Sequence, residues 1–314
     1  MTNIHDIAKL SGYSVSTVSR VLNQKNYVSD DARVKIQQVI DQMDYVPNDV
    51  ARDLSRGKTY NIGVVLPYTK HAYFGQILDG IMSEAYKLGY RVLVLLSNYD
   101  QKKEREFLEQ LRRKAFDALI FTSHGLPLEE IAKYLKYGQI VCCQNPGDVK
   151  MPAAYTERYH TYVEAFTWVK EHGYSKIAIM QNRDYRKSAT SEKTIAAFQN
   201  VFGVMPDPKL IVNNITTYDN GYEAGKYYHD SGLNPDFVFA NSDDIATGFR
   251  QFYIDNQLEI PAFMGQEGQL PSQILGFSTI DHQLTKVGAA AFKVASSDEQ
   301  QTIRIPSIFI NRCK

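Results

Sequence analysis

The sequence predicts a small all-α head at the N-terminus followed by a large α/β body of two doubly wound parallel sheets. Three observations support this prediction. The first 60 residues contain a succession of short amphipathic helical patterns. From residue 61 onward, short apolar runs alternate with helical stretches, which is typical of parallel sheets covered by helices. The chain has 314 residues, more than one domain usually holds, so two or three units are expected.

The segment NIHDIAKLSGYSVSTVSRVLN predicts two short helices separated by a tight turn at Gly12. Asn3 is expected to cap the first helix and Ser14 the second, Val15–Leu22. A third helix is expected to begin at Ser29. The apolar residues expected on the inner sides of these helices are Ile4, Ile7, Ala8, Leu10, Val18, Val21, Leu22, Val34, Ile36, Val39, Ile40 and Met43.

Three helices with this turn fit a helix-turn-helix unit, whose second helix enters the major groove of DNA. Val15 and Ser16 begin the second helix and are expected to contact base edges, while Arg20 bonds a guanine or a phosphate. Thr17 and Ser19 are expected phosphate contacts. The alternative is a plain three-helix bundle. Charge does not decide between them, because residues 1–60 hold eight Lys or Arg and seven Asp or Glu.

A fourth, very short helix is expected after the head. Pro47 cannot continue the third helix, and Asn48 is suited to cap a new helix that ends at Gly57. This helix is too short to be stable alone, and Leu54 would be an exposed apolar residue on it. We expect the helix to order on DNA, pair with its copy across a dimer, and insert Leu54 into a minor-groove step. The alternative is a linker whose Leu54 packs on the body.

The segments IHDIAKLSGYSVSTVSRVLN, YVPNDVARDLS and NIGVVLP resemble the LacI/GalR family of bacterial transcriptional repressors, and the resemblance runs essentially end to end. It implies that the second helix reads the major groove, that the hinge leucine intercalates, and that the body has a two-lobed periplasmic-binding-protein-like fold. The residues expected to bind DNA are Val15, Ser16, Thr17, Ser19, Arg20, Asn48, Ala51, Arg52 and Leu54.

Within the body, strands are expected at 62–66, 92–96, 118–121, 140–143, 177–180, 210–212, 237–240 and 263–265. Helices are expected at 73–88, 103–114, 128–137, 162–172, 191–202, 221–231 and 244–256. The expected domains are a head at 1–46, a hinge and linker at 47–60, and the body at 61–314. The body would divide into an N-lobe, about 61–153 and 283–297, and a C-lobe, about 154–282 and 298–314.

Ligands of such sheets bind at the carboxyl ends of strands, here across a cleft between the lobes. Tyr73 and Phe74 follow the first strand and suit stacking on a sugar or a base, with core packing as the alternative. The resemblance places Glu267 where the family usually has an aspartate that clamps ligand hydroxyls. The residues expected to bind the effector are Tyr73, Phe74, Ser123, Arg186, Thr190, Thr194, Thr216, Asp243 and Glu267.

Several positions depart from the family pattern. Thr194 and Ser188 stand at frequent arginine positions, Thr216 at an aromatic one and Thr156 at an aspartate. The effector of a known family member therefore cannot be assigned to this chain by resemblance. We expect a sugar or sugar phosphate. The basic residues Arg183, Arg186 and Lys187 form either a solvated loop or a phosphate clamp.

These observations predict a DNA-binding repressor controlled by a small carbohydrate effector. The expected partners are a pseudo-palindromic duplex operator, the effector and a second copy of the chain. Two alternatives remain: the same regulator controlled by a purine or a phosphoprotein, and a sugar-binding receptor without DNA function. No cofactor or metal is expected, because the seven histidines and three cysteines lack metal-ligand spacing.

Composition and motifs narrow the remaining classes. The 35 basic and 35 acidic residues cancel, so net charge gives no general attraction to nucleic acid. The N-terminus lacks a signal-peptide pattern and no apolar run spans a membrane, so a cytoplasmic protein is expected. The sparse cysteines, two of them adjacent at Cys142 and Cys143, fit a reducing compartment. No nucleophile, metal or dinucleotide motif is present, and enzyme activity is not expected.

Overall fold

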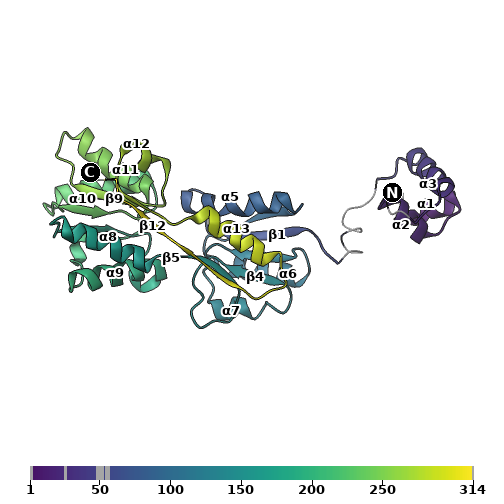
Figure 1. Cartoon of the computed structure of the whole chain (residues 1–314), viewed down its shortest axis with the longest axis horizontal. Coiled ribbons are helices and arrows are strands. Elements are labelled where there is room, and N and C mark those ends of the chain that lie inside the picture. The colour runs from purple at the N-terminus through teal and green to yellow at the C-terminus, as the bar shows by residue number, and fades with distance from the viewer. Residues whose placement is uncertain (1–2, 25–26, 47–52, 54–56, 313–314) are drawn as a thin grey trace. The chain divides into compact units, whose positions relative to one another are not determined.

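The computed structural model describes residues 3–24, 27–46, 53 and 57–312 (Figure 1). The chain divides into two compact units, Met1–Tyr60 and Asn61–Lys314. Four of the residues expected to bind DNA through the hinge lie outside the described residues; they are Asn48, Ala51, Arg52 and Leu54.

The head contains the three expected helices, α1 (Ile4–Ser11), α2 (Val15–Leu22) and α3 (Asp30–Gln42). The Asn3 side chain caps α1 by accepting from the backbone N–H groups of His5 and Asp6, and Gly12 ends α1 at a φ of 74°. The head core is formed by one buried face of each helix, and its buried members are Ile7, Ala8, Val18, Val21, Ile36 and Ile40.

Three residues expected in the head core are exposed instead: Leu10, Val34 and Met43. Val34 precedes the buried Ile36 by two residues, and two residues turn a helix by about 200°, so Val34 faces outward. Met43 lies beyond the last turn of α3, where it caps the helix end. The core therefore takes up a narrower stripe of α1 and α3 than the apolar pattern suggested.

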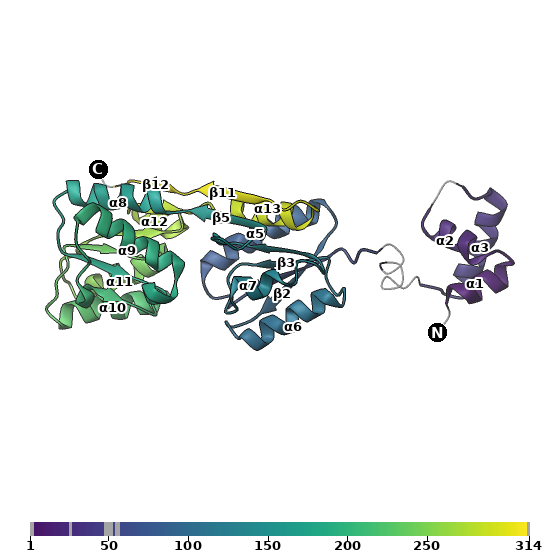
Figure 2. The same cartoon turned by 90° about the horizontal axis from the view of Figure 1, so that it is seen from below.

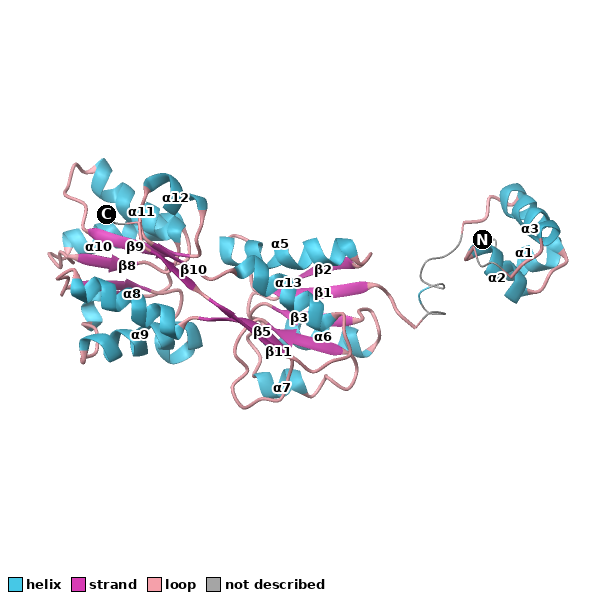
Figure 3. Ribbon diagram, in the orientation of Figure 1, coloured by secondary structure: helices cyan, strands magenta, loops and turns pink. Residues whose placement is uncertain are grey.

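The body contains two six-stranded sheets, coloured magenta in Figure 3. The N-lobe sheet has the order β11-β5-β4-β3-β1-β2 and the C-lobe sheet the order β12-β10-β9-β8-β6-β7. All pairings are parallel except that of β10 with β12. The strands are β1 (Asn61–Leu66), β2 (Arg91–Leu96), β3 (Ala118–Phe121), β4 (Gln139–Cys142), β5 (Ala153–Glu157), β6 (Ile177–Met180), β7 (Ile211–Val212), β8 (Phe237–Phe239), β9 (Ala262–Gln266), β10 (Thr279–Asp281), β11 (Thr302–Pro306) and β12 (Ile308–Ile310).

Helices cover both faces of each sheet, and each lobe has two buried apolar clusters, in keeping with a doubly wound fold. The body helices are α5 (Ala72–Lys87), α6 (Gln101–Arg112), α7 (Leu128–Ala132), α8 (Tyr159–Glu171), α9 (Ala189–Phe202), α10 (Tyr218–Asp230), α11 (Asp243–Asp255), α12 (Leu270–Leu275) and α13 (Leu284–Ala295), with short 3₁₀ turns at Tyr185–Lys187 and Pro208–Leu210. Among the helices of the described residues, none has the length and apolar character to cross a bilayer.

The chain crosses between the lobes three times, from β5 into α8, from β10 into α13 and from β11 into β12 (Figure 2). The expected lobe boundaries at 153–154 and 297–298 are too early in the sequence. Strands β5 and β11 pair along their whole length inside the N-lobe sheet, from Ala153 opposite Thr302 to Glu157 opposite Pro306. Neither strand carries a long apolar run, which is why the sequence pattern did not place them in the N-lobe.

Strand β2 was expected to be buried, but it is the edge strand of the N-lobe sheet, and its one strand partner among the described residues is β1. Its side chains at Leu93, Val94 and Leu96 are exposed. By contrast, Cys142 and Cys143 are buried and free, as expected for small apolar residues. They belong to the two clusters on opposite faces of the sheet, so their sulfur atoms point apart.

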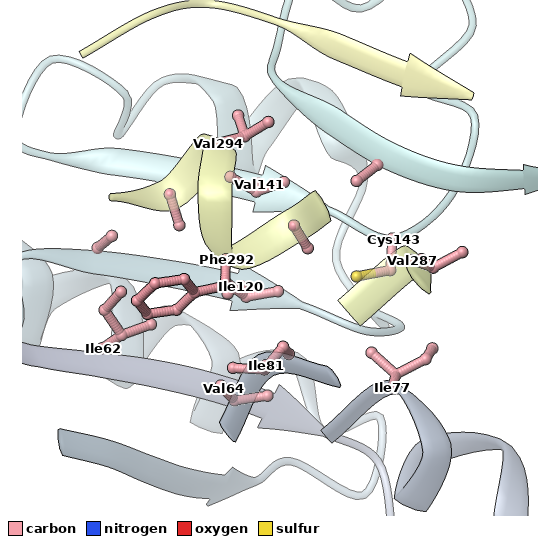
Figure 4. Close-up of a cluster of buried hydrophobic side chains, with 14 of the residues drawn as sticks. Ile62, Val64, Ile77, Ile81, Ile120, Val141, Cys143, Val287, Phe292 and Val294 are labelled. Atoms are coloured by element: carbon pink, nitrogen blue, oxygen red, sulfur yellow. The ribbon is translucent and has the colours of Figure 1, made fainter. Parts of the chain in front are cut away.

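The core of the N-lobe depends on close contact between α5 and α13, whose side chains Ile77, Ile81, Val287 and Phe292 meet above the sheet (Figure 4). Two glycines permit this contact. A Cβ atom at Gly80 would lie 2.0 Å from the backbone oxygen of Thr285, and one at Gly288 would lie 1.9 Å from that of Ile77.

We therefore predict that Gly80→Ala lowers the free energy of unfolding by about 2–3 kcal/mol, because the helices must separate. Gly75→Ala is the matched control on the same helix, since a Cβ there meets no atom within 4 Å. The control should raise stability by about 0.5–1 kcal/mol. Urea unfolding of the two variants measures the difference, and equal effects at both positions would contradict the proposed close contact.

Candidate functional site

The first candidate site is the outer face of α2 in the head. Ser16 and Arg20 are exposed on this helix, whereas Val15, Thr17 and Ser19 are half-buried. Val15 packs against the head core, which leaves only part of its side chain for a contact with a base. The face therefore presents a hydroxyl near the start of the helix and a guanidinium near its end.

Hydroxyl groups are concentrated at the N-terminus of α2. The Ser14 hydroxyl accepts from the backbone N–H of Thr17, and it lies 2.8 Å from the Ser16 hydroxyl and 2.9 Å from the Thr17 hydroxyl. At the other end, the Asn23 amide donates to the carbonyl of Ser19 at 2.8 Å. These bonds fix the two ends of the helix while the Ser16 and Arg20 side chains remain exposed.

The second candidate site is a cavity between the two lobes of the body, with a volume of about 180 Å³. Its walls come from the carboxyl ends of parallel strands in both sheets, where ligands of doubly wound folds bind. The N-lobe contributes the start of α5 and the loops after β3 and β4, and the C-lobe contributes the loops after β6, β8 and β9 and the start of α9. Six of the nine residues expected to bind the effector line this cavity: Tyr73, Phe74, Ser123, Thr190, Thr194 and Glu267.

The two aromatic residues of α5 do not offer free stacking faces. Phe74 is buried in the core of the N-lobe, so the alternative interpretation, core packing, is the correct one for this residue. The Tyr73 hydroxyl accepts from an Arg158 nitrogen at 3.1 Å, and the Arg158 guanidinium also lies over the Tyr73 ring at 5.4 Å. Tyr73 therefore orients an arginine in the cavity.

Three expected residues do not line the cavity. Arg186 is exposed and pairs with Asp184 in the same turn, at 2.6 Å. Thr216 donates to the Asn220 side chain at the start of α10. Asp243 is fully buried and accepts from the Thr279 hydroxyl and the Gln269 backbone N–H, both at 2.6 Å. It therefore fixes the segment after β9 without lining the cavity.

Glu267 lies where the lobes meet, at the end of β9. Its carboxyl oxygen is 3.6 Å from the His71 ring, its other oxygen accepts from the Gln269 amide, and its backbone oxygen accepts from Gln76 of α5. Burial, together with the charge of Asp243, raises the pKa of Glu267 well above 4.5, although the Arg158 charge opposes the shift. The protonated carboxyl form is favoured accordingly.

Burial alters two further titrating groups near this point. It raises the pKa of Asp243 to about 7, against the hydrogen bonds from Thr279 and Gln269 that lower it. It also lowers the pKa of His71 to about 4, so this histidine is neutral at pH 7. His71 accepts the backbone N–H of Tyr73 through Nδ1, which caps α5.

Several cavity residues were not in the predicted set. Gln181 and Asn241 follow β6 and β8, so the strand-end rule that selected Ser123 also applies to them. Arg158 and Thr156 lie at the crossing from β5, a strand that the sequence pattern did not reveal. The loop residues Arg183 and Lys193 also line the cavity, whereas Arg186 from the same basic cluster does not.

Two contacts join the lobes beside the cavity, between the loop after β6 and the N-lobe. The Asn182 amide donates to the Tyr68 hydroxyl at 3.1 Å, and the Arg183 guanidinium lies 4.7 Å from the centre of the Tyr99 ring. These contacts join the loop after β6 to the N-lobe. Any opening of the lobes must break them.

Comparison with known proteins agrees with this architecture. Residues 3–48 match the bacterial regulatory proteins of the lacI family, and residues 59–313 match the periplasmic binding proteins and sugar binding domain of LacI family. Catabolite control protein B of Bacillus subtilis is 36% identical over 309 residues, which cover 98% of this chain and 99% of that protein. The sucrose operon repressor of Streptococcus mutans is 28% identical over 206 residues, 66% of this chain and 63% of that protein.

Solved structures show the same fold. The lac repressor dimer bound to operator and the anti-inducer ONPF superimposes with a TM-score of 0.83 at 18% identity, over 99% of this chain and 98% of that chain. A LacI family regulator from Lactobacillus casei with bound sucrose gives a TM-score of 0.70 at 22% identity, over 80% of this chain and 98% of that chain.

A helix-turn-helix unit followed by a two-lobed body of the sugar-binding type defines a class of bacterial transcriptional regulators. The chain belongs to the LacI family of that class. It is a transcriptional repressor of this family with a sugar-binding domain, and it is not an enzyme.

Proposed function

We propose that the chain acts as a homodimer that binds a pseudo-palindromic operator through two heads and responds to a small polyhydroxylated effector in the cleft between its lobes. The observation that carries this proposal is the cavity itself, because it is built from the strand ends of both lobes. A ligand that touches both walls favours one relative position of the lobes, which is the requirement for control by binding.

In this proposal residues 1–46 form the DNA-binding head and residues 47–60 the hinge. Ser16 and Arg20 contact the major groove, because they are the exposed members of the expected set on α2. Val15, Thr17 and Ser19 add closer contacts to a base methyl group and to phosphates. Closure of the cleft alters the spacing of the two hinges in the dimer and so couples effector binding to operator affinity.

The cavity suits a single sugar unit. A volume of about 180 Å³ corresponds to about six water molecules at their liquid volume of about 30 Å³ each, which is room for a small polar ligand. Its lining offers the amides of Gln181 and Asn241 and the hydroxyls of Thr156 and Ser123. These donors and acceptors fit the hydroxyls of a carbohydrate.

The other effectors have less support. A purine would need an open aromatic face, but a guanidinium already lies over the rings of Tyr73 and Tyr99. For a phosphoprotein partner, the described residues offer no particular surface. A receptor without DNA function would not need Ser16 and Arg20 exposed on a capped helix. As an operator-binding repressor, the protein would act in the bacterial cytoplasm.

The DNA-binding part of the proposal is tested by selecting duplexes from a random library with the full-length protein. We expect enrichment of a pseudo-palindrome with two equivalent half-sites. The control is Arg20→Ala, which removes an exposed side chain and leaves the head core intact. If the wild type enriches no symmetric sequence beyond what the control enriches, the proposal fails.

The homodimer is supported by exposed apolar side chains on neighbouring elements of the N-lobe. Strand β2 has an open edge, and a sheet edge with apolar residues is a ready pairing surface. Helix α5 packs beside β2, so its exposed side chains extend the same surface. The exposed apolar residues of this surface are Met82, Tyr86, Leu88, Leu93, Val94 and Leu96.

We predict that Leu96→Glu converts the dimer to a monomer, since it places a charge at this surface, where Leu96 is 49% exposed in the single chain. The matched control is Val204→Glu, which changes a 61% exposed apolar residue after α9 in the C-lobe. Light scattering after size exclusion measures the mass of each variant. A dimer that survives Leu96→Glu would place the interface elsewhere.

A further inference from the structure

We infer that the effector carries a compact anionic group, a phosphate ester or a carboxylate, which pairs with the guanidinium of Arg158 inside the cleft. The inference rests on the proposed function, because it names the class of molecule that the same cleft binds. Its starting point is Arg158, a residue that the sequence pattern did not select.

Arg158 is a buried cation that forms no ion pair among the described residues, although Glu267 is near enough to interact with its charge. It is 8% exposed and stands at the crossing from β5 to α8. Within the part of the chain that the structure describes, no carboxylate oxygen forms an ion pair with it within 4 Å, and its side-chain hydrogen bonds, to Tyr73 and Tyr162, are to hydroxyl groups. Burying a charge without an ionic partner is costly.

The exposed arginines of the same chain show the contrast. Arg105 pairs with Glu130 at 2.6 Å, and Arg112 pairs with Glu109 at the same distance, although water could solvate both cations. The arginine that most needs a counter-charge is therefore one that lacks it. A ligand that brings an anion into the cleft would provide it.

The other charges around the cavity do not cancel that of Arg158. Arg183 and Lys193 line the same cavity and are cationic, although Lys193 lies 3.8 Å from Glu157. Glu267 is the carboxyl group among the described lining residues. Because burial raises its pKa, Glu267 tends to offer a hydrogen-bond donor rather than an opposing negative charge.

The cavity that Arg158 lines also contains buried polar atoms without hydrogen-bond partners among the described residues. Both polar atoms of the Gln181 amide are buried without a hydrogen bond among the described residues, and so are the Thr156 hydroxyl and the Asn241 side-chain oxygen. Gln181 is 2% exposed and lines the cavity. Buried polar atoms in native proteins are normally paired, so these atoms are suited to ligand groups that both donate and accept.

Together these groups define the ligand as an acidic sugar. Gln181, Thr156 and Asn241 match hydroxyls, and Arg158 matches the anion. The phosphate ester and the carboxylate share this chemistry. They differ in charge and shape, so matched probes can distinguish them.

The test measures thermal shifts and binding heats of the full-length protein in chloride buffer at constant ionic strength. The probes are glucose, glucose 6-phosphate, gluconate, 6-phosphogluconate and inorganic phosphate. We expect the anionic sugars to raise the melting temperature more than glucose does at equal concentration, because a ligand bound only by the folded state stabilises it. The phosphorylated and carboxylate probes then show which anion is preferred.

Arg158→Gln should weaken the binding of the anionic probes at least tenfold. Arg105→Gln is the control, since it removes a surface arginine of the N-lobe. The inference is overturned if no anionic probe shifts the melting temperature, if glucose and its phosphate shift it equally, or if Arg158→Gln binds the anionic probes as the wild type does.

A second measurement separates ligand binding from a structural role. Arg158→Met replaces the buried charge by an apolar chain of similar length, and without ligand it should melt at or above the wild-type temperature. A clear fall would show that the charge supports the fold and would contradict the inference. If only neutral sugars bind, the inference of an anionic group is wrong, while the proposal of a sugar effector in the cleft stands. If the protein binds no operator, the proposed function is wrong, while the inference about the ligand is unaffected.

Discussion

Glu267→Ala is expected to abolish the response to the effector while operator binding persists. Glu267 is the carboxyl group that the C-lobe places against His71 and Gln76 of the N-lobe, at the edge of the cavity. Removing it takes away a hydrogen-bonding group from the wall that the ligand must bridge. Leaving a buried ligand group unpaired in this way costs about 1–3 kcal/mol, or roughly 5- to 150-fold in effector affinity.

The variant Glu267→Gln separates shape from charge. Because burial raises the pKa of Glu267 well above 4.5, the native side chain is favoured as a neutral acid that donates a hydrogen bond. Glutamine is also neutral and has a donor, so it should retain part of the response that alanine loses. Calorimetric titration with the preferred anionic sugar compares the three proteins, and an unchanged response in Glu267→Ala would remove this residue from the site.

The stability difference between the wild type and Glu267→Gln is expected to depend on pH. A carboxyl group whose folded pKa is raised contributes fully to stability below its unfolded pKa, and this contribution is lost as pH rises through the folded pKa. Wild-type stability relative to Glu267→Gln should therefore fall as the pH rises above 4.5. Melting curves of both proteins across that range measure it, and a parallel pH profile would refute the raised pKa.

Leu54→Ala is expected to weaken operator binding by about 100-fold, equivalent to about 2.7 kcal/mol. Leu54 lies outside the described residues, so this prediction rests on the hinge sequence. A leucine wedge in a minor-groove step is favourable because the kink lets more of the protein contact the duplex. Alanine is too short to act as a wedge.

Leu54→Met is the matched control, since methionine keeps a long apolar side chain and helix propensity. Fluorescence anisotropy with a labelled operator should give nearly wild-type affinity for methionine and the large loss for alanine. Effector binding by Leu54→Ala should not change. Equal operator affinities of the alanine variant and the wild type would exclude the wedge.

Local sequence signals predicted most of the fold. The caps at Asn3 and Ser14 and the glycine at Gly12 define the head helices, because each satisfies or ends a helix locally. Long apolar runs such as 177–180 matched strands of the C-lobe sheet. The strands β5 and β10 were not placed, because neither carries a long apolar run and both depend on pairing with distant segments.

The cavity was only partly predictable. The strand-end rule found Ser123 and applies equally to Gln181 and Asn241. It could not show that Asp243 faces away from the cavity, since that depends on its close contact with Gly265, where an added Cβ would lie 2.2 Å from the Asp243 oxygen. Nor could it find Arg158, whose position follows from the crossing between the lobes.

The most direct test of control by an effector is an anisotropy titration of the selected operator with the full-length protein. It is done with and without a saturating amount of the anionic sugar that gives the largest thermal shift. Control by the effector predicts at least a fivefold change in apparent Kd for the wild type, in either direction, and none for Glu267→Ala. An operator affinity that is the same with the effector bound and without it would contradict control of the operator by the effector.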